Sequence, residues 1–134
     1  MKNNKFKELV DYRLKKAKGK LKSVMSLYEN GYYEDSISRS YYAMLLAARA
    51  ILVTKGLQSK THSGTITLFF QHFVKEKLFP EDISKFLSKG KRIRENVDYG
   101  DFTIITDEDA NEEIKNAKKF INEAEYLINK LYKK

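Results

Sequence analysis

The segment from residue 36 to residue 53, "SISRSYYAMLLAARAILV", constrains the fold most, because it is apolar on almost every side of a helix. Such a helix needs other elements around it to bury its surface. The apolar run is interrupted by Arg49 and is shorter than the ~20 residues that a membrane span requires. We therefore expect a central, buried helix from about Tyr33 to Gly56, and no membrane segment.

The segments on either side of this helix have one apolar face each. Their apolar residues recur every three or four positions, which indicates amphipathic helices. These helices are expected over residues 6–28, 63–74, 80–99 and 106–131, and only a weak "FTII" at 102–105 suggests a strand. The sequence therefore predicts one domain, residues 1–134, folded as an all-α, antiparallel up-and-down bundle of four to five helices.

Residues that start or stop helices mark the predicted boundaries. Ser63 is the expected N-cap of the third helix, and Pro80 suits the first turn of the fourth. Thr106 and Asp109 have the spacing of a capping box at the start of the last helix. Gly90 is expected to weaken the middle of the fourth helix.

Composition excludes several kinds of site. The chain has no cysteine, so it has no disulfide and no thiolate ligand or nucleophile. Its two histidines, His62 and His72, do not have a metal-ligand spacing, and there is no glycine-rich phosphate loop. No apolar segment follows the basic N-terminus, so we expect no signal peptide. We expect no metal, no other cofactor, and a cytoplasmic protein.

Positive charge is concentrated near the N-terminus. The net charge is +8, and residues 1–22 hold nine lysines and arginines against Glu8 and Asp11. Such a stripe attracts phosphate backbones or acidic partners. Lysines that only keep a helix face hydrated give the same pattern, and both interpretations stay open.

Polar side chains stand on helix faces that should be apolar. They are Ser36, Arg39 and Tyr42 on the second helix, and Arg94, Asn96, Asp98 and Tyr99 on the fourth. One interpretation is structural: Arg39 needs a partner near a buried helix, and Asp98 is the natural candidate for an ion pair between the two helices. The functional interpretation is a polar cleft, lined by Arg39, Tyr42, Arg94, Asp98 and Tyr99, that binds a phosphodiester, with His62 as a further candidate ligand contact.

Three stretches together resemble the HEPN family (higher eukaryotes and prokaryotes nucleotide-binding). They are "SISRSYYAMLLAARAIL", "GLQSKTHSGTITLFFQHFV" and "RIRENVDYGDF", which lie between about Asp35 and Phe102. The resemblance is to the compact prokaryotic members. It implies a helical bundle, often a homodimer with a polar groove between the copies. It also implies metal-independent ribonuclease activity, RNA or nucleotide binding without cleavage, or pairing with a small nucleotidyltransferase in a toxin–antitoxin system.

The catalytic signature of that family is an arginine followed, four to six residues later, by a histidine. Arg94 matches the arginine, and Glu95 or Asn96 matches the polar residue that commonly follows it. Tyr99 stands near the place of the histidine, and no imidazole occurs through residue 101. Tyrosine, with a pKa of about 10, is a poor base, whereas histidine titrates near neutrality.

We therefore expect a HEPN-type module that binds RNA or a nucleotide, or acts with a nucleotidyltransferase, with nuclease activity reduced or lost. Two alternatives remain. The first is an active metal-independent endoribonuclease that uses Arg94 with Asp98, Tyr99 or His62. The second is a non-catalytic scaffold in which the polar cluster only sets helix register.

Overall fold

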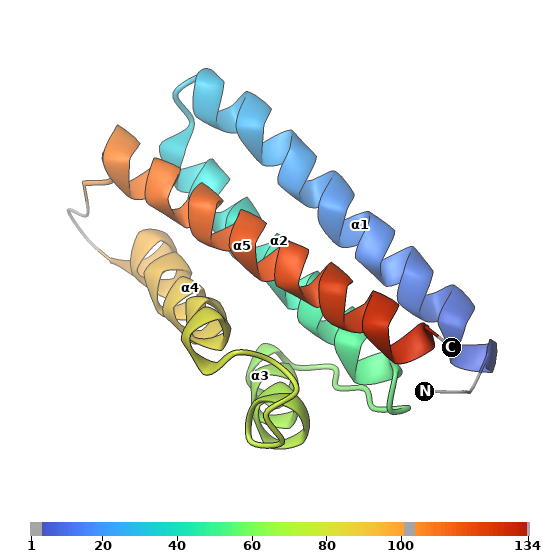
Figure 1. Cartoon of the computed structure of the whole chain (residues 1–134). Helices are drawn as coiled ribbons and strands as arrows, with labels where there is room; N and C mark the ends of the chain where they lie inside the picture. Colours follow the sequence, from blue (N-terminus) through green and yellow to red (C-terminus); the bar gives the residue numbers. More distant parts are fainter. Residues whose placement is uncertain (1–3, 101–103, 134) are drawn as a thin grey trace.

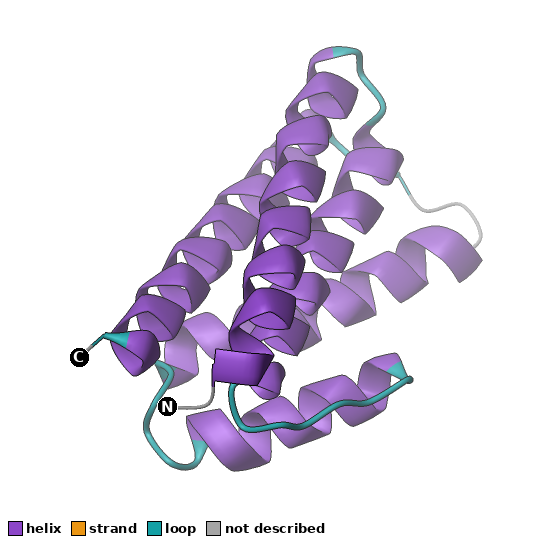
Figure 2. Ribbon diagram, turned by 90° about the vertical axis from the view of Figure 1, so that its right-hand side faces the viewer, coloured by secondary structure: helices purple, strands orange, loops and turns teal. Residues whose placement is uncertain are grey.

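The computed structural model describes residues 4–100 and 104–133, and side chains from Phe6 onward. Four long helices run alternately up and down, as predicted: α1 (Asn4–Glu29), α2 (Tyr33–Val53), α4 (Glu81–Tyr99) and α5 (Asp107–Tyr132). The short α3 (His62–Phe69) and a π-helical turn (Phe70–Val74) lie at one end of the bundle (Figure 1). No strand occurs in the described part of the chain. Its elements are all helices and loops (Figure 2).

The central position of α2 confirms what its composition predicts. It contacts α1, α3, α4 and α5, and from Ala43 to Val53 only Arg49 is not buried. Because α2 offers apolar side chains on all sides, each neighbouring helix buries its own apolar stripe against it. On α5 this stripe is formed by Ala110, Ile114, Ala117, Ile121, Ala124 and Ile128, all of them buried.

The helix ends agree only in part with the predicted signals. The capping box of Thr106 and Asp109 is present at the start of α5. Pro80 precedes α4 directly, one residue outside the helix rather than in its first turn. The predicted N-cap Ser63 is wrong: Thr61 caps α3, and its hydroxyl accepts a hydrogen bond from the Gly64 N–H.

Gly90 does not interrupt α4, which runs through it without a break. A Cβ at this position would lie 3.0 Å from the Met44 side chain and 3.4 Å from that of Tyr41. The glycine thus allows α4 to approach α2 closely. This close approach explains why α4 packs on the core although a glycine lowers the helix propensity of its middle.

Candidate functional site

A cavity of about 450 Å³ lies between α2, α3 and α4, with one residue from the end of α1. We call it the His62 cavity. Its lining consists of Leu27, Asp35, Ser38, Arg39, Tyr41, Tyr42, His62 and Arg94. Four of the eight candidate site residues from the sequence, Arg39, Tyr42, His62 and Arg94, therefore meet at one place.

Helical spacing brings the α2 residues to this cavity. Asp35, Ser38, Arg39 and Tyr42 follow one another at intervals that place them on one face of the helix. Arg39 is exposed and Tyr42 is half-buried. The guanidinium of Arg39 therefore stands at the mouth of the cavity, where a charged ligand can reach it.

His62 reaches the cavity from the first residue of α3. Arg49 of α2 holds this end of α3: its Nε donates to Thr65 Oγ1 at 3.2 Å, and its Nη2 lies 3.5 Å from the Lys60 carbonyl oxygen. The arginine that interrupts the apolar run of α2 thus has a positional role. It ties α3 to the central helix and sets where the imidazole stands.

Tyr41 stands between His62 and Arg94. Its hydroxyl lies 3.2 Å from Nδ1 of His62, within hydrogen-bond distance, and Arg94 Cζ lies 6.0 Å from the centre of its ring. The side chain is fully buried, and burial raises the pKa of Tyr41 to about 12, although Arg94 and Arg49 oppose this shift. Tyr41 therefore stays a neutral phenol that orients the imidazole.

The surroundings of His62 favour the neutral imidazole. Burial lowers the pKa of His62 from 6.5, and the positive charges of Arg49, Arg94 and Lys91 lower it further, while Glu95 opposes them. The positive end of the α3 dipole acts in the same direction. At neutral pH the ring is therefore uncharged and offers one nitrogen as an acceptor and the other as a donor.

The predicted ion pair between Arg39 and Asp98 is wrong. Asp98 pairs instead with Arg94, four residues earlier on α4, at 3.4 Å between Nε and Oδ2. Both partners keep about a third of their side-chain surface exposed. Arg39 is exposed at the cavity mouth, so it does not need a buried carboxylate, and the helices are not joined by this pair.

The other predicted site residues lie outside the cavity. The Ser36 hydroxyl is buried and donates to the Tyr33 carbonyl within α2. Asn96 lines a different pocket, between α4 and α5. Tyr99, placed by the motif where the histidine should be, is 82% exposed. Asp101 and Phe102, which end the "RIRENVDYGDF" stretch, lie outside the described residues.

Sequence reasoning did not select Tyr41, Ser38, Asp35 or Arg49 as part of this site. Arg49 had the clearest signal, because a charged residue in an apolar run needs polar partners. Asp35 and Ser38 share the helical spacing of Arg39 and Tyr42, which is a weaker signal. Tyr41 gave none, because a buried aromatic residue in a central helix is ordinary core.

The described residues contain no group of three or more histidine and acidic side chains placed to hold a metal ion. Within the same residues, no helix has the length and apolar character needed to cross a bilayer. The polar lining of the His62 cavity consists of two arginines, a histidine, two tyrosines, a serine and an aspartate.

Comparison with known proteins agrees with this fold. The HEPN domain family model matches residues 10–127, so the chain belongs to the HEPN domain family. A protein of Methanocaldococcus jannaschii named "Putative toxin MJ0605" is 32% identical over 131 residues, which cover 98% of this chain and 92% of that protein.

Two further relatives carry the name "UPF0332 protein". The one from Archaeoglobus fulgidus is 36% identical over 121 residues, covering 90% of this chain and 96% of the relative. The one from Thermotoga maritima is 28% identical over 128 residues, covering 96% of this chain and 97% of the relative. The likeness thus extends over nearly the whole of each protein. The resemblance stated from the sequence is confirmed.

Proposed function

We propose that this HEPN protein binds RNA and that the His62 cavity holds a phosphate of the RNA backbone. The observation that supports this most is the meeting of Arg39, Arg94 and His62, from three helices, in one cavity. Arginine binds phosphate through two parallel N–H groups, and a neutral imidazole adds another donor. The exposed lysines along α1 supply the long-range attraction that brings a polyanion to the surface.

RNA binding at this site is tested by fluorescence anisotropy with a labelled single-stranded RNA. Arg94→Ala should weaken binding about tenfold. The slope of log K against log salt concentration should become less steep by roughly 0.7, the value for one phosphate contact with a single strand. Arg92→Ala is the matched control, because Arg92 lies on the same helix but is exposed and does not line the cavity. Equal losses in the two variants would contradict binding in the cavity.

A second candidate function, metal-independent RNA cleavage, is supported by the position of His62. The family motif of this chain has Arg94 but no histidine after it, and a histidine from α3 stands in the cavity that Arg94 lines. In the tautomer whose Nδ1–H donates to the Tyr41 hydroxyl, the Nε2 lone pair is left to accept a proton. This is the form that a general base requires.

The reaction would proceed by attack of the RNA 2′-oxygen on the adjacent phosphorus. His62 takes the 2′-hydroxyl proton, and Arg94 stabilises the negative charge that develops on the phosphate. The bond to the 5′-oxygen then breaks, and the imidazolium returns its proton to that oxygen. The products are a 2′,3′-cyclic phosphate and a 5′-hydroxyl.

Cleavage is tested in EDTA on labelled RNA, with His62→Ala, Arg94→Ala and the control His72→Gln. His72 is the other histidine and does not line the cavity. The first two variants should lose about a hundredfold or more in rate, and the control should keep its rate. As the pH is lowered, the wild-type rate should fall with a midpoint below pH 6.5, because the pKa of His62 is lowered. Cleavage that persists unchanged in His62→Ala would rule out His62 as the general base.

We also propose that the protein acts in a toxin–antitoxin system or beside a small nucleotidyltransferase. The names of relatives such as "Putative toxin MJ0605" support a toxin role. Induced expression of the chain should arrest growth, and Arg94→Ala should relieve the arrest. Relief by co-expression of a neighbouring nucleotidyltransferase gene would support the partner, and its failure would exclude that gene product.

A further inference from the structure

We propose that the groove between α1 and α5 is a docking site for an acidic, amphipathic helix of a partner protein. This groove, the α1–α5 groove, has a volume of about 720 Å³, and α1 and α5 form it, whereas seven of the eight residues of the His62 cavity come from α2, α3 and α4. It is lined by eleven residues, eight on α1 and three on α5. It shares no residue with the His62 cavity, so the proposal does not depend on the function proposed for that cavity.

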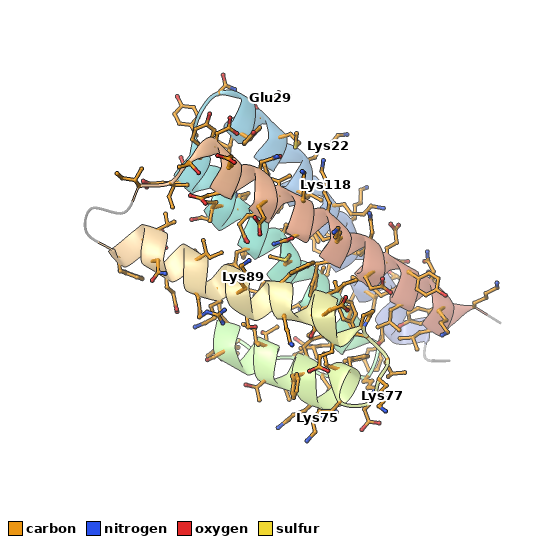
Figure 3. All side chains as sticks on the ribbon, turned by 60° about the vertical axis from the view of Figure 1, so that its left-hand side comes forward. Lys22, Glu29, Lys75, Lys77, Lys89 and Lys118 are labelled. Carbon is orange, nitrogen blue, oxygen red and sulfur yellow. The ribbon has the colours of Figure 1, made fainter. Side chains whose placement is uncertain are left out.

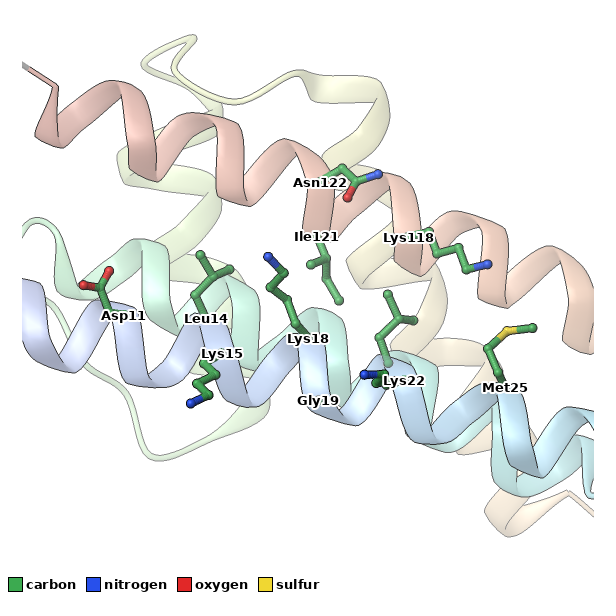
Figure 4. A pocket seen from close by; sticks show the side chains of 11 residues that line it. Asp11, Leu14, Lys15, Lys18, Gly19, Lys22, Met25, Lys118, Ile121 and Asn122 are labelled. Carbon is green, nitrogen blue, oxygen red and sulfur yellow. The ribbon is translucent and has the colours of Figure 1, made fainter.

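The floor of the groove is apolar. Leu14, Leu21 and Met25 of α1 and Ile121 of α5 line it, and Leu21 and Met25 are half-buried rather than enclosed. In Figure 4, Leu14 extends from α1 towards α5, and Ile121 extends from α5 towards α1. Between them Gly19 leaves a gap, since a Cβ at that position meets nothing within 4 Å.

The rim of the groove is positively charged. Lys15, Lys18, Lys22 and Lys118 stand along it, and Asp11 is its single acidic residue. Figure 3 shows Lys22 on α1 and Lys118 on α5 projecting from the surface of the bundle.

Two of these charges are already matched. Asp11 pairs with Lys7 at 2.9 Å, and Lys18 pairs with Glu125 at 2.7 Å. Within the described part of the chain, no ion pair forms at Lys15, Lys22 or Lys118. The rim therefore has an excess of positive charge that is complementary to an acidic ligand.

A helix is the form of ligand that fits this groove. The lining residues of α1 run from Asp11 to Met25, which is about 21 Å along a helix axis, or the length of about four turns. Two helix surfaces that lie side by side offer no strand edge for an extended peptide. A ligand helix with apolar residues on one face and carboxylates beside them would contact both the floor and the rim.

Charge argues against a second copy of this chain, and the apolar floor argues against a nucleic acid. Two copies of this chain would set lysine rims against each other, and like charges across an interface oppose association. A nucleic acid would match the lysines but would leave the apolar floor without a contact. A partner protein with acidic and apolar residues satisfies both.

The test uses full-length protein and a labelled synthetic helix of about 15 residues, with leucine on one face and glutamate on the flanks. Gly19→Phe fills the gap in the floor, and Gly19→Ala is its matched control. We expect the wild type to bind the peptide with a Kd below about 100 μM, and Gly19→Phe to weaken binding at least about tenfold. Gly19→Ala should bind as the wild type does.

Three further arms make the result decisive. Replacing Lys15, Lys22 and Lys118 by glutamate should abolish binding, and a peptide with lysine in place of glutamate should not bind the wild type. Circular dichroism melts check that Gly19→Phe is folded, which the open space at Gly19 favours. If the wild type does not bind the acidic peptide, or if Gly19→Phe binds it normally, the proposal is wrong. If Gly19→Phe instead loses affinity for single-stranded RNA, the groove is a nucleic-acid site.

Discussion

At the residue scale, the imidazole of His62 and the carboxyl group of Glu113 are placed where burial opposes their charged forms. For His62, burial and the nearby arginines lower the pKa. For Glu113, which is 2% exposed on α5, burial raises the pKa, while Lys89 and Asn116 oppose the shift. Both groups therefore make the stability of the fold depend on pH, in opposite directions.

The stability that depends on His62 should be lost in acid. Because its folded pKa lies below the unfolded value of 6.5, the unfolded state binds the proton more tightly. The contribution of neutral His62 is fully present above pH 6.5 and declines as the pH falls below it. Urea unfolding from pH 5 to pH 8 should therefore show a smaller acid loss in His62→Gln than in the wild type. Identical pH profiles would contradict the burial of the imidazole.

Replacing Glu113 should stabilise the protein at neutral pH but not in acid. Its folded pKa lies above the ordinary 4.5, so its favourable contribution exists below that pH and is lost as the pH rises through the folded value. Among the described residues, none hydrogen-bonds its Oε2 atom. Glu113→Gln removes the charge at similar volume. The free energy of unfolding of the variant, minus that of the wild type, should increase between pH 4 and pH 8, and a constant difference would refute the prediction.

At the element scale, a glycine in the middle of a helix has two opposite meanings in this chain. Gly19 of α1 and Gly90 of α4 give the same signal in the sequence, a weak point in a helix. The structure separates them. Gly19 faces open space, whereas a Cβ at Gly90 would lie only 3.0 Å from the Met44 side chain and in contact with Tyr41 and Glu113.

The two glycines form a matched pair for mutagenesis. Gly19→Ala should stabilise the protein by about 1 kcal/mol, the difference in helix propensity between the two residues. Gly90→Val should destabilise it by about 1–3 kcal/mol, because the added side chain overpacks the contact between α4 and α2. Chemical denaturation of the two variants measures both effects. Stabilisation by both substitutions would mean that α4 can move away from α2 at little cost.

At the scale of the whole molecule, the bundle leaves large apolar side chains uncovered where α4 ends. Tyr99 is 82% exposed and Ile104 is 84% exposed. Tyr99 is the last residue of α4, the helix that carries Arg94, and Ile104 lies in the loop before α5. Large apolar side chains this exposed are candidates for a contact surface.

We predict that the protein is a homodimer that buries these residues, as the family resemblance implies. Light scattering at micromolar concentration should give twice the 15.7 kDa mass of the chain. The double variant Tyr99→Glu, Ile104→Glu should give the single mass and keep its helical circular dichroism. Tyr12→Glu is the control, because Tyr12 is 62% exposed on α1. A wild type of 15.7 kDa would count against the dimer.

The sequence alone determined the helices and the place of α2 in the middle of the bundle. These features depend on apolar periodicity and on capping residues, which act over a few neighbouring positions along the chain. It also identified Arg39, Tyr42 and Arg94 as candidates, because polar residues on apolar faces stand out, and His62 as one of two histidines.

Only the tertiary structure decided which of these residues meet. His62 is more than thirty residues from Arg94 in the chain, and it reaches the cavity because Thr61 caps α3 and Arg49 holds its first turn. One sequence interpretation paired Arg39 with Asp98, and the other placed Asp98 and Tyr99 in a cleft with Arg39, Tyr42 and Arg94, whereas neither Asp98 nor Tyr99 lines the cavity. Contacts between helices depend on how all of them pack, and no local spacing encodes that packing.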